Sequence, residues 1–171
     1  YKVGIWLAPG MNIQRHPLCG RNYEYYSEDP ILTAEMASAL TLGVQSNKHC
    51  AVTIKHFCCN NQEDNRMKSS SEVNERALRE IYLKAFKLTV RKAQPKCVMS
   101  SYNKVNGTYV NSSYDLITNI LRCEFGFDGV VMTDWQSVAK DQAVAGETIC
   151  AENDLIMAGD QYQHKKLLNA V

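Results

Sequence analysis

Short apolar runs that alternate with longer amphipathic segments are the feature that most constrains the fold of this chain. The runs predict strands at residues 3–8, 50–57, 97–102, 129–134 and 154–158. Each run is mainly apolar rather than alternating, which is typical of strands buried on both faces of a parallel sheet. Helical patterns follow these runs, and a succession of βα units predicts an α/β fold.

The segments between the runs predict helices. Pro30 suits the first helical position after Asp29, because its missing N–H would have no partner there. Amphipathic spacing, capping residues and a stop at proline then define the other segments. We expect helices over residues 30–45, from a capping box at Ser69 and Glu72 to Pro95, over 113–124 and 136–145, and after His164.

Repeated βα units suit either a doubly wound sheet or a (β/α)8 barrel. The phosphate-binding sequences G-x-G-x-x-G and G-x-x-x-x-G-K do not follow any predicted strand, which favours the barrel. A closed barrel takes about 250 residues, whereas this chain has 171 residues. We therefore predict that residues 1–171 form a partial (β/α)8 TIM-type barrel of roughly five βα units. Further barrel segments or a second copy would cover its open strand edges.

Composition excludes several classes of function. Nineteen Lys and Arg residues against 18 Asp and Glu residues give a net charge of +1, far from the basic balance of nucleic-acid-binding proteins. No apolar run approaches the roughly 18 residues of a membrane span. We therefore expect neither a nucleic-acid nor a membrane partner.

The cysteines indicate reduced thiols rather than disulfides or metal ligands. They are odd in number, seven in all, and scattered along the chain. No C-x-x-C pair occurs and the histidines lack zinc-ligand spacing, so we expect no metal and no cofactor. Unpaired, buried cysteines favour a cytoplasmic location, although the sequence is silent on export.

Polar side chains concentrate where the predicted strands end. The carboxyl ends of barrel strands meet at one mouth, where barrel enzymes carry out their chemistry. An aspartate at the end of an apolar strand is costly to bury as an ion, and nearby cations would keep it ionised. Such a carboxylate can act as a nucleophile or a general base, and a tryptophan offers a flat face to a sugar ring. The residues concerned are Arg21 after the first strand, Lys55 and His56, Tyr102, and Asp134 with Trp135.

Four of these residues also have a structural interpretation. Asp134 could cap a following helix, and Trp135 could be ordinary core. Lys55 and His56 could pair with a core carboxylate. Lys55 could instead be the Schiff-base amine of an aldolase, and a sugar-binding or assembly-only barrel piece is the non-enzymatic alternative.

Two Asn-x-Ser/Thr sequences, at Asn106 and Asn111, match glycosylation sequons. Asn106-Gly107 is more simply a tight turn, because both residue types tolerate positive φ. We expect the turn.

Several strings resemble glycoside hydrolase family 3, in particular its β-glucosidase branch. The resemblance covers almost the whole chain, and the motifs occur in the family's order. They are residues 8–30 with Arg21, Lys55-His56-Phe57, residues 60–66 with Arg66, residues 98–103 with Tyr102, and Val131-Met132-Thr133-Asp134-Trp135.

The resemblance implies a retaining, exo-acting β-glycosidase that releases terminal β-D-glucose from β-linked glucosides or oligosaccharides. Asp134 would attack the anomeric carbon and form a covalent glycosyl-enzyme. Substrate-binding roles are implied for Arg21, Lys55, His56, Arg66, Met99, Tyr102 and Trp135. A β-xylosidase of the same family is the alternative, since the two sugars differ chiefly in the hydroxymethyl group.

The resemblance also implies a missing partner for Asp134. In this branch the acid/base is a glutamate on a separate α/β sandwich domain, and nothing in this chain resembles that domain. The branch that removes N-acetylhexosamines carries its acid/base in a Pro-Gly-His-Gly loop, where this chain has Cys58-Cys59-Asn60. Glu24, Glu28 and Glu63 are acids near the mouth with stronger structural interpretations. We therefore expect the chain alone to hydrolyse little or nothing.

Overall fold

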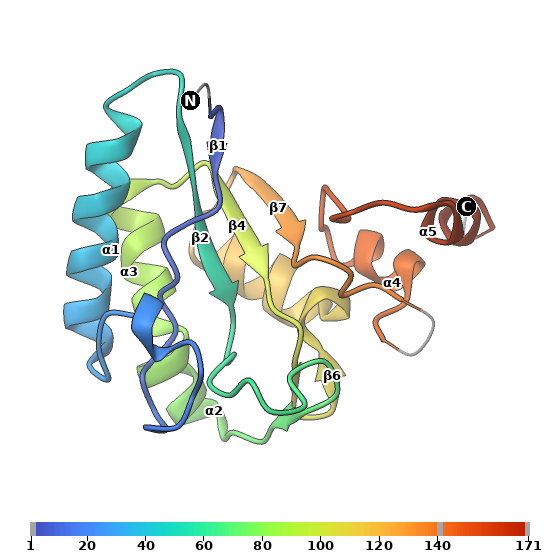
Figure 1. The fold of residues 1–171 in the computed structure, drawn as a ribbon, viewed down its shortest axis with the longest axis horizontal. Helices are drawn as coiled ribbons and strands as arrows, with labels where there is room; N and C mark the ends of the chain where they lie inside the picture. Colours follow the sequence, from blue (N-terminus) through green and yellow to red (C-terminus); the bar gives the residue numbers. More distant parts are fainter. Residues whose placement is uncertain (1–2, 140–141, 170–171) are drawn as a thin grey trace.

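A parallel sheet lies at the centre of the structure, a computed structural model that describes residues 3–139 and 142–169 (Figure 1). Within these residues the sheet has four strands, in the spatial order β1, β2, β4, β7. Spatial order follows chain order, as in consecutive βα units of a barrel. The strands are β1 (Ile5–Trp6), β2 (Ala51–Phe57), β4 (Cys97–Ser100) and β7 (Val130–Thr133).

Helices α1 (Pro30–Gln45) and α3 (Lys84–Ala93) lie side by side on one face of this sheet (Figure 1). The Asp29 side chain caps α1 as expected, accepting the backbone N–H of Ile31 at 2.6 Å. None of the described helices is long and apolar enough to cross a membrane. The remaining helical segments are η1 (Asn22–Glu24), α2 (Glu75–Ala77), η2 (Leu78–Tyr82), η3 (Val110–Ser112), η4 (Asp115–Glu124), α4 (Ala145–Cys150) and α5 (Gln161–Leu168).

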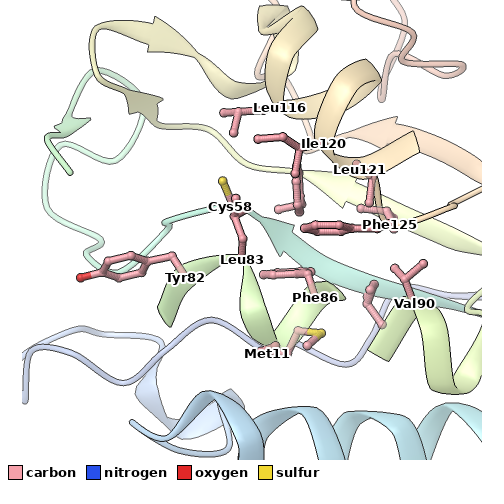
Figure 2. Close-up of a cluster of buried hydrophobic side chains, with 14 of the residues drawn as sticks. Met11, Cys58, Tyr82, Leu83, Phe86, Val90, Leu116, Ile120, Leu121 and Phe125 are labelled. Atoms are coloured by element: carbon pink, nitrogen blue, oxygen red, sulfur yellow. The ribbon is translucent and has the colours of Figure 1, made fainter. Parts of the chain in front are cut away.

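The main core fills the space between the sheet and these helices. Phe57 of β2 and Phe86 of α3 meet edge to face, with ring centroids 5.3 Å apart, and both are fully buried. Figure 2 shows Phe86 in this cluster together with Leu121 and Phe125. A smaller cluster forms on the other face of the sheet, the face that lines a barrel interior: Cys97, Met99 and Met132, with Leu7, Ala51 and Met157 packed against them.

A short hairpin lies beyond β4. Its strands are β5 (Lys104–Val105) and β6 (Thr108–Tyr109), and β3 (Ser70–Ser71) pairs with β5. Asn106 and Gly107 form the turn with φ of 49° and 86°, which confirms the predicted tight turn. The Asn106 amide donates to the Val73 carbonyl at 2.9 Å and accepts the Val73 N–H at 2.8 Å.

The capping box predicted at Ser69 and Glu72 does not form. The chain between them is β3, which pairs with β5 across more than thirty residues of sequence. The helix begins only at α2, where the Asn74 side chain accepts a first-turn N–H at 2.9 Å. Long-range strand pairing has overridden a local capping signal.

Two other predicted elements after β7 are shorter or displaced. The predicted helix over residues 136–145 is irregular at 136–139 and 142–144, residues 140–141 lie outside the described residues, and α4 begins only at Ala145. Gln136 has a φ of 59°, and the Ser137 hydroxyl donates to the Asp134 carbonyl at 2.8 Å, so the chain turns there. The strand predicted at 154–158 is reduced to a single parallel bridge between Leu155 and Met132, because a turn follows at residues 157–158.

All seven cysteines are free thiols. Most are buried or partly buried, as expected of small core side chains. The prediction of burial is wrong for Cys123 and Cys150, which are exposed.

Candidate active site

The Asp134 carboxylate follows β7 and lines an open pocket of about 450 Å³. Its side chain is 8% exposed. Oδ1 accepts the backbone N–H of Trp135 at 2.7 Å. Oδ2 is buried and has no hydrogen-bond partner at ordinary distance within the described residues; the nearby donor is His56 Nε2 at 3.6 Å. The pocket is lined by Gly20, Arg21, Tyr23, Glu63, Arg66, Tyr102, Asp134 and Trp135.

The loop after β1 folds back onto the end of β2. Gly10 bridges Lys55, and the Lys55 N–H donates to the Pro9 carbonyl at 3.0 Å. A Cβ on Gly10 would lie 2.9 Å from Glu24 Oε2 and 3.0 Å from the Tyr25 ring, so both side chains would have to shift. A glycine at this position therefore lets Glu24 and Tyr25 pack against the end of β2.

Glu24 joins two cations beside the pocket. Arg21 Nε donates to Glu24 Oε1, and Lys55 Nζ lies 3.8 Å from Glu24 Oε2. Burial lowers the pKa of Lys55, and the Glu24 carboxylate acts in the opposite direction. The pair of cations is thus held in place by one shared carboxylate.

His56 is fixed from three directions. Its backbone N–H donates to Asn12 Oδ1 and its carbonyl accepts from Asn12 Nδ2, both at 2.8 Å. Its Nδ1 lies 3.4 Å from the Tyr25 hydroxyl, and its Nε2 faces Asp134. Burial, followed by the charges of Arg21 and Lys55, lowers the pKa of His56 well below its usual value, so the ring is neutral at pH 7.

Arg66, Tyr102 and Trp135 form the other wall of the pocket. Arg66 Nη1 donates to Glu63 Oε2 at 2.7 Å, and the guanidinium carbon lies 4.4 Å from the Tyr102 ring centroid. The Tyr102 hydroxyl donates to the Trp135 carbonyl at 2.6 Å. Burial and the nearby Asp134 charge raise the pKa of Tyr102 to about 12, so it stays protonated. Trp135 is 49% exposed and lines the pocket.

Opposing effects act on the Asp134 carboxyl. Burial raises its pKa, while the Trp135 N–H and the charges of Arg21, Arg66 and Lys55 lower it. The site therefore places a buried carboxylate among three cations, as its position after an apolar strand predicted.

The structure brings most of the predicted site residues together. Five of them line one pocket: Arg21, Arg66, Tyr102, Asp134 and Trp135. Lys55 lies beside it, paired with the Glu24 carboxylate that also binds Arg21, and His56 faces Asp134. Met99 lies apart: it is 2% exposed and packs with Cys97 and Met132 on the barrel-interior face. Among residues 3–139 and 142–169, no group of three His, Cys, Asp or Glu side chains is placed to hold a metal ion.

Two contributors were not assigned these roles from the sequence. Glu24 bridges Arg21 and Lys55, and Tyr25 contacts His56. The sequence signal that could have indicated them was Gly10, because a glycine near a strand end often marks a place where other groups approach the backbone closely. The interpretation of Asp134 as a helix cap does not hold, because its Oδ1 accepts an N–H in a turn.

Replacing Asp134 with asparagine is expected to stabilise the protein at pH 7. A carboxyl whose pKa is raised in the folded state binds its proton more tightly there, so it favours folding below the ordinary aspartate pKa. That contribution is lost as pH rises through the folded pKa. Thermal unfolding from pH 3 to 8 should show a higher Tm for the variant at neutral pH and a gap that closes on acidification. A wild type more stable than the variant at pH 7 would contradict this expectation.

Comparisons with known proteins identify relatives of this chain. Residues 2–160 match the model of the glycosyl hydrolase family 3 N-terminal domain. The chain is 51% identical over 162 residues to a β-glucosidase of Ruminococcus albus, covering 91% of the chain and 17% of that protein. It is 49% identical over 134 residues to an exo-α-(1→6)-L-arabinopyranosidase of Bifidobacterium longum, covering 78% of the chain and 18% of that protein.

A solved structure is also similar. β-Glucosidase 3B from Thermotoga neapolitana, in complex with glucose, superposes with a TM-score of 0.88 at 52% identity, covering 94% of this chain and 22% of that one. The likeness confirms the predicted fold class, a partial (β/α)8 barrel. The chain spans about a fifth of the length of the curated relatives it matches.

Proposed function

The chain belongs to glycoside hydrolase family 3, and from this premise we propose that it supplies the nucleophile side of the active site of a retaining, exo-acting β-glycosidase. The observation that supports this is the Asp134 carboxylate, anchored through one oxygen by Trp135 N–H and set among Arg21, Lys55 and Arg66 beside an open pocket. Relatives named β-glucosidase favour terminal β-D-glucose as the sugar released.

The proposed reaction has two displacements at the anomeric carbon. The Asp134 carboxylate attacks this carbon while the bond to the leaving oxygen breaks, and an acid protonates that oxygen. Water then attacks the same carbon, gives a proton to the conjugate base, and the ester bond to Asp134 breaks. Two inversions leave the sugar with its original configuration. The mechanism needs a second carboxyl group about 5–5.5 Å from the first.

We assign the second carboxyl to a part of the protein beyond this chain. Glu24 and Glu63 lie beside the pocket, but each is already engaged in an ion pair with an arginine, Arg21 and Arg66 respectively. Family resemblance puts the acid/base on an α/β sandwich domain. On this proposal, residues 1–171 are a piece of the barrel domain and have little activity alone.

Sugar binding is assigned to the groups that surround the nucleophile. Arg21, Lys55 and Arg66 present several N–H donors suited to hydroxyl oxygens. Trp135 is half-exposed at the edge of the pocket, where its indole would stack on the sugar that follows the terminal one. Tyr102 stays beside Asp134 as a neutral donor, His56 takes part through its contact with Asp134, and Met99 would contribute from the barrel interior.

The test is covalent trapping in the longest natural protein that contains this chain, here called the parent protein. We expect 2-deoxy-2-fluoro-β-D-glucosyl fluoride to add one fluoroglucosyl group, detected as an intact-mass increase and mapped to the peptide with Asp134. The fluorine slows hydrolysis of the glycosyl ester, so the adduct accumulates. Hydrolysis of a 4-nitrophenyl β-glucoside without any adduct on Asp134 would reject the nucleophile. Borohydride trapping of a carbonyl substrate on Lys55 would instead support the aldolase alternative.

A second sugar is favoured by two relatives named as arabinopyranosidases. The Bifidobacterium longum protein acts, by its name, on L-arabinopyranose, a pentose without a hydroxymethyl group. Relative kcat/KM values for 4-nitrophenyl β-D-glucoside, β-D-xyloside and α-L-arabinopyranoside would rank these sugars. Preference for either pentoside would reject the glucosidase assignment while keeping the glycosidase.

A further inference from the structure

We propose that Tyr25 is a positioning residue for the reaction: its hydroxyl fixes the tautomer of His56, and His56 holds the buried oxygen of the Asp134 carboxylate. The inference rests on the proposed function. It goes further, because it gives His56 a role toward the nucleophile and gives a role to a tyrosine outside the pocket lining.

The three side chains form a row from the loop after β1 to the end of β7. The Tyr25 hydroxyl lies 3.4 Å from His56 Nδ1, and His56 Nε2 lies 3.6 Å from Asp134 Oδ2. His56 is 1% exposed and Tyr25 is 5% exposed, so solvent does not replace either contact. Asn12 holds the His56 backbone through both of its hydrogen-bonding groups, which limits movement of the ring.

Only one tautomer of His56 satisfies both neighbours. A neutral imidazole has one N–H, and an ionised carboxylate can only accept. Nε2 must therefore carry the proton when it faces Asp134 Oδ2. Nδ1 is then unprotonated and must accept a hydrogen bond from the Tyr25 hydroxyl. The Tyr25 hydroxyl has an alternative acceptor, the Asn60 carbonyl at 3.5 Å. Donation there would leave the Tyr25 oxygen free to accept from Nδ1–H, and that tautomer turns the Nε2 lone pair toward the carboxylate, which is repulsive.

Both ends of the carboxylate are then fixed. Trp135 N–H donates to Oδ1 at 2.7 Å, and His56 Nε2 faces Oδ2 at 3.6 Å, so on this proposal the plane of the nucleophile is set before substrate binds. The charged and titratable groups that act on Asp134 are Arg21 from the loop after β1, Lys55 and His56 of β2, Arg66 from the loop after β2, and Tyr102 after β4. Only His56 among them contacts Tyr25 through a hydrogen bond.

The first measurement compares Tyr25→Phe with wild type in the parent protein. The variant keeps the ring and removes the donor to Nδ1. We expect kcat/KM for 4-nitrophenyl β-glucoside to fall about tenfold. The acid limb of its pH profile should move to higher pH by roughly one unit, because a carboxylate that loses the N–H facing it is easier to protonate. A merely structural loss would lower activity without moving this limb.

The matched control is Tyr26→Phe. Tyr26 is the next residue, is half-buried, and packs against the main core, so it reports the cost of removing a neighbouring hydroxyl. Its pH profile should superpose on that of wild type. Equal shifts in the two variants, or no shift in Tyr25→Phe, would overturn the inference.

A double-mutant cycle distinguishes an effect that acts through His56 from a general folding defect. If Tyr25 acts through His56, Tyr25→Phe should cost little further activity in a His56→Gln background. A full tenfold additional loss there would overturn the inference. Fluoroglucosyl labelling of wild type separates the two claims: an Asp134 adduct with an unshifted Tyr25→Phe profile rejects only the role of Tyr25, whereas an inactive, unlabelled wild type rejects both.

Discussion

Asp134→Ala in the parent protein is expected to lower the hydrolysis of aryl β-glucosides by on the order of 10⁴–10⁶-fold. The substitution removes the only group that we assign to attack the anomeric carbon. The three cations around it, Arg21, Lys55 and Arg66, remain to bind the sugar. We therefore expect the loss in kcat, measured as release of 4-nitrophenol, with a far smaller change in KM.

Added azide provides a second readout for this variant. A small anion that enters the space left by the carboxylate would attack from the same side and give the α-glucosyl azide in one displacement. Asp128→Ala is the control, because Asp128 is exposed in the loop before β7 and lies outside the pocket. Activity of Asp134→Ala within tenfold of wild type would reject the assignment of the nucleophile.

Gly129→Ala is expected to destabilise the folded protein by at least about 3 kcal/mol. A Cβ at Gly129 would lie 2.4 Å from the Lys96 carbonyl oxygen and 2.8 Å from the Phe127 ring. The Lys96 carbonyl also accepts the Val130 N–H at 3.0 Å, so it cannot move without breaking the start of β7. Because Asp134 directly follows β7, urea unfolding and fluoroglucosyl labelling should both report the damage.

Gly43→Ala is the matched control for this substitution. Gly43 lies inside α1 and has nothing within 4 Å of its Cβ position. Alanine favours a helix interior over glycine by roughly 0.5–1 kcal/mol, so this variant should be slightly more stable than wild type. If the two variants unfold at the same urea concentration, the steric explanation for Gly129 is wrong.

The elements that the sequence predicts well are those whose signals are local. Asp29-Pro30 marks the start of α1, and Asn106-Gly107 marks the hairpin turn. The capping box at Ser69 and Glu72 is equally local, but β3 finds a partner in β5 that a local pattern cannot show. The strand predicted at 154–158 shrinks to one bridge because its length depends on pairing and on the turn that follows.

The candidate site divides in the same way. Asp134 and Tyr102 come from strand ends, so the parallel sheet alone brings them together. Glu24 and Tyr25 reach the site only because their loop folds over β2 at Gly10, and loop paths are set by tertiary contacts. Burial of His56 behind Asp134 is likewise a property of packing, which residue types alone do not specify.

The Asn106-Gly107 turn bears on chemical ageing. Asn-Gly is the dipeptide in which deamidation is fastest, because the unhindered glycine nitrogen attacks the asparagine side-chain carbonyl carbon and expels ammonia through a cyclic imide. Here the Asn106 amide is held at both ends by Val73, and the Gly107 N–H donates to the Ser70 hydroxyl at 2.9 Å. The attacking nitrogen and its target are each engaged elsewhere. Deamidation of Asn106 should therefore require opening of the hairpin. The rate of isoaspartate formation during storage then measures how often this hairpin unfolds locally.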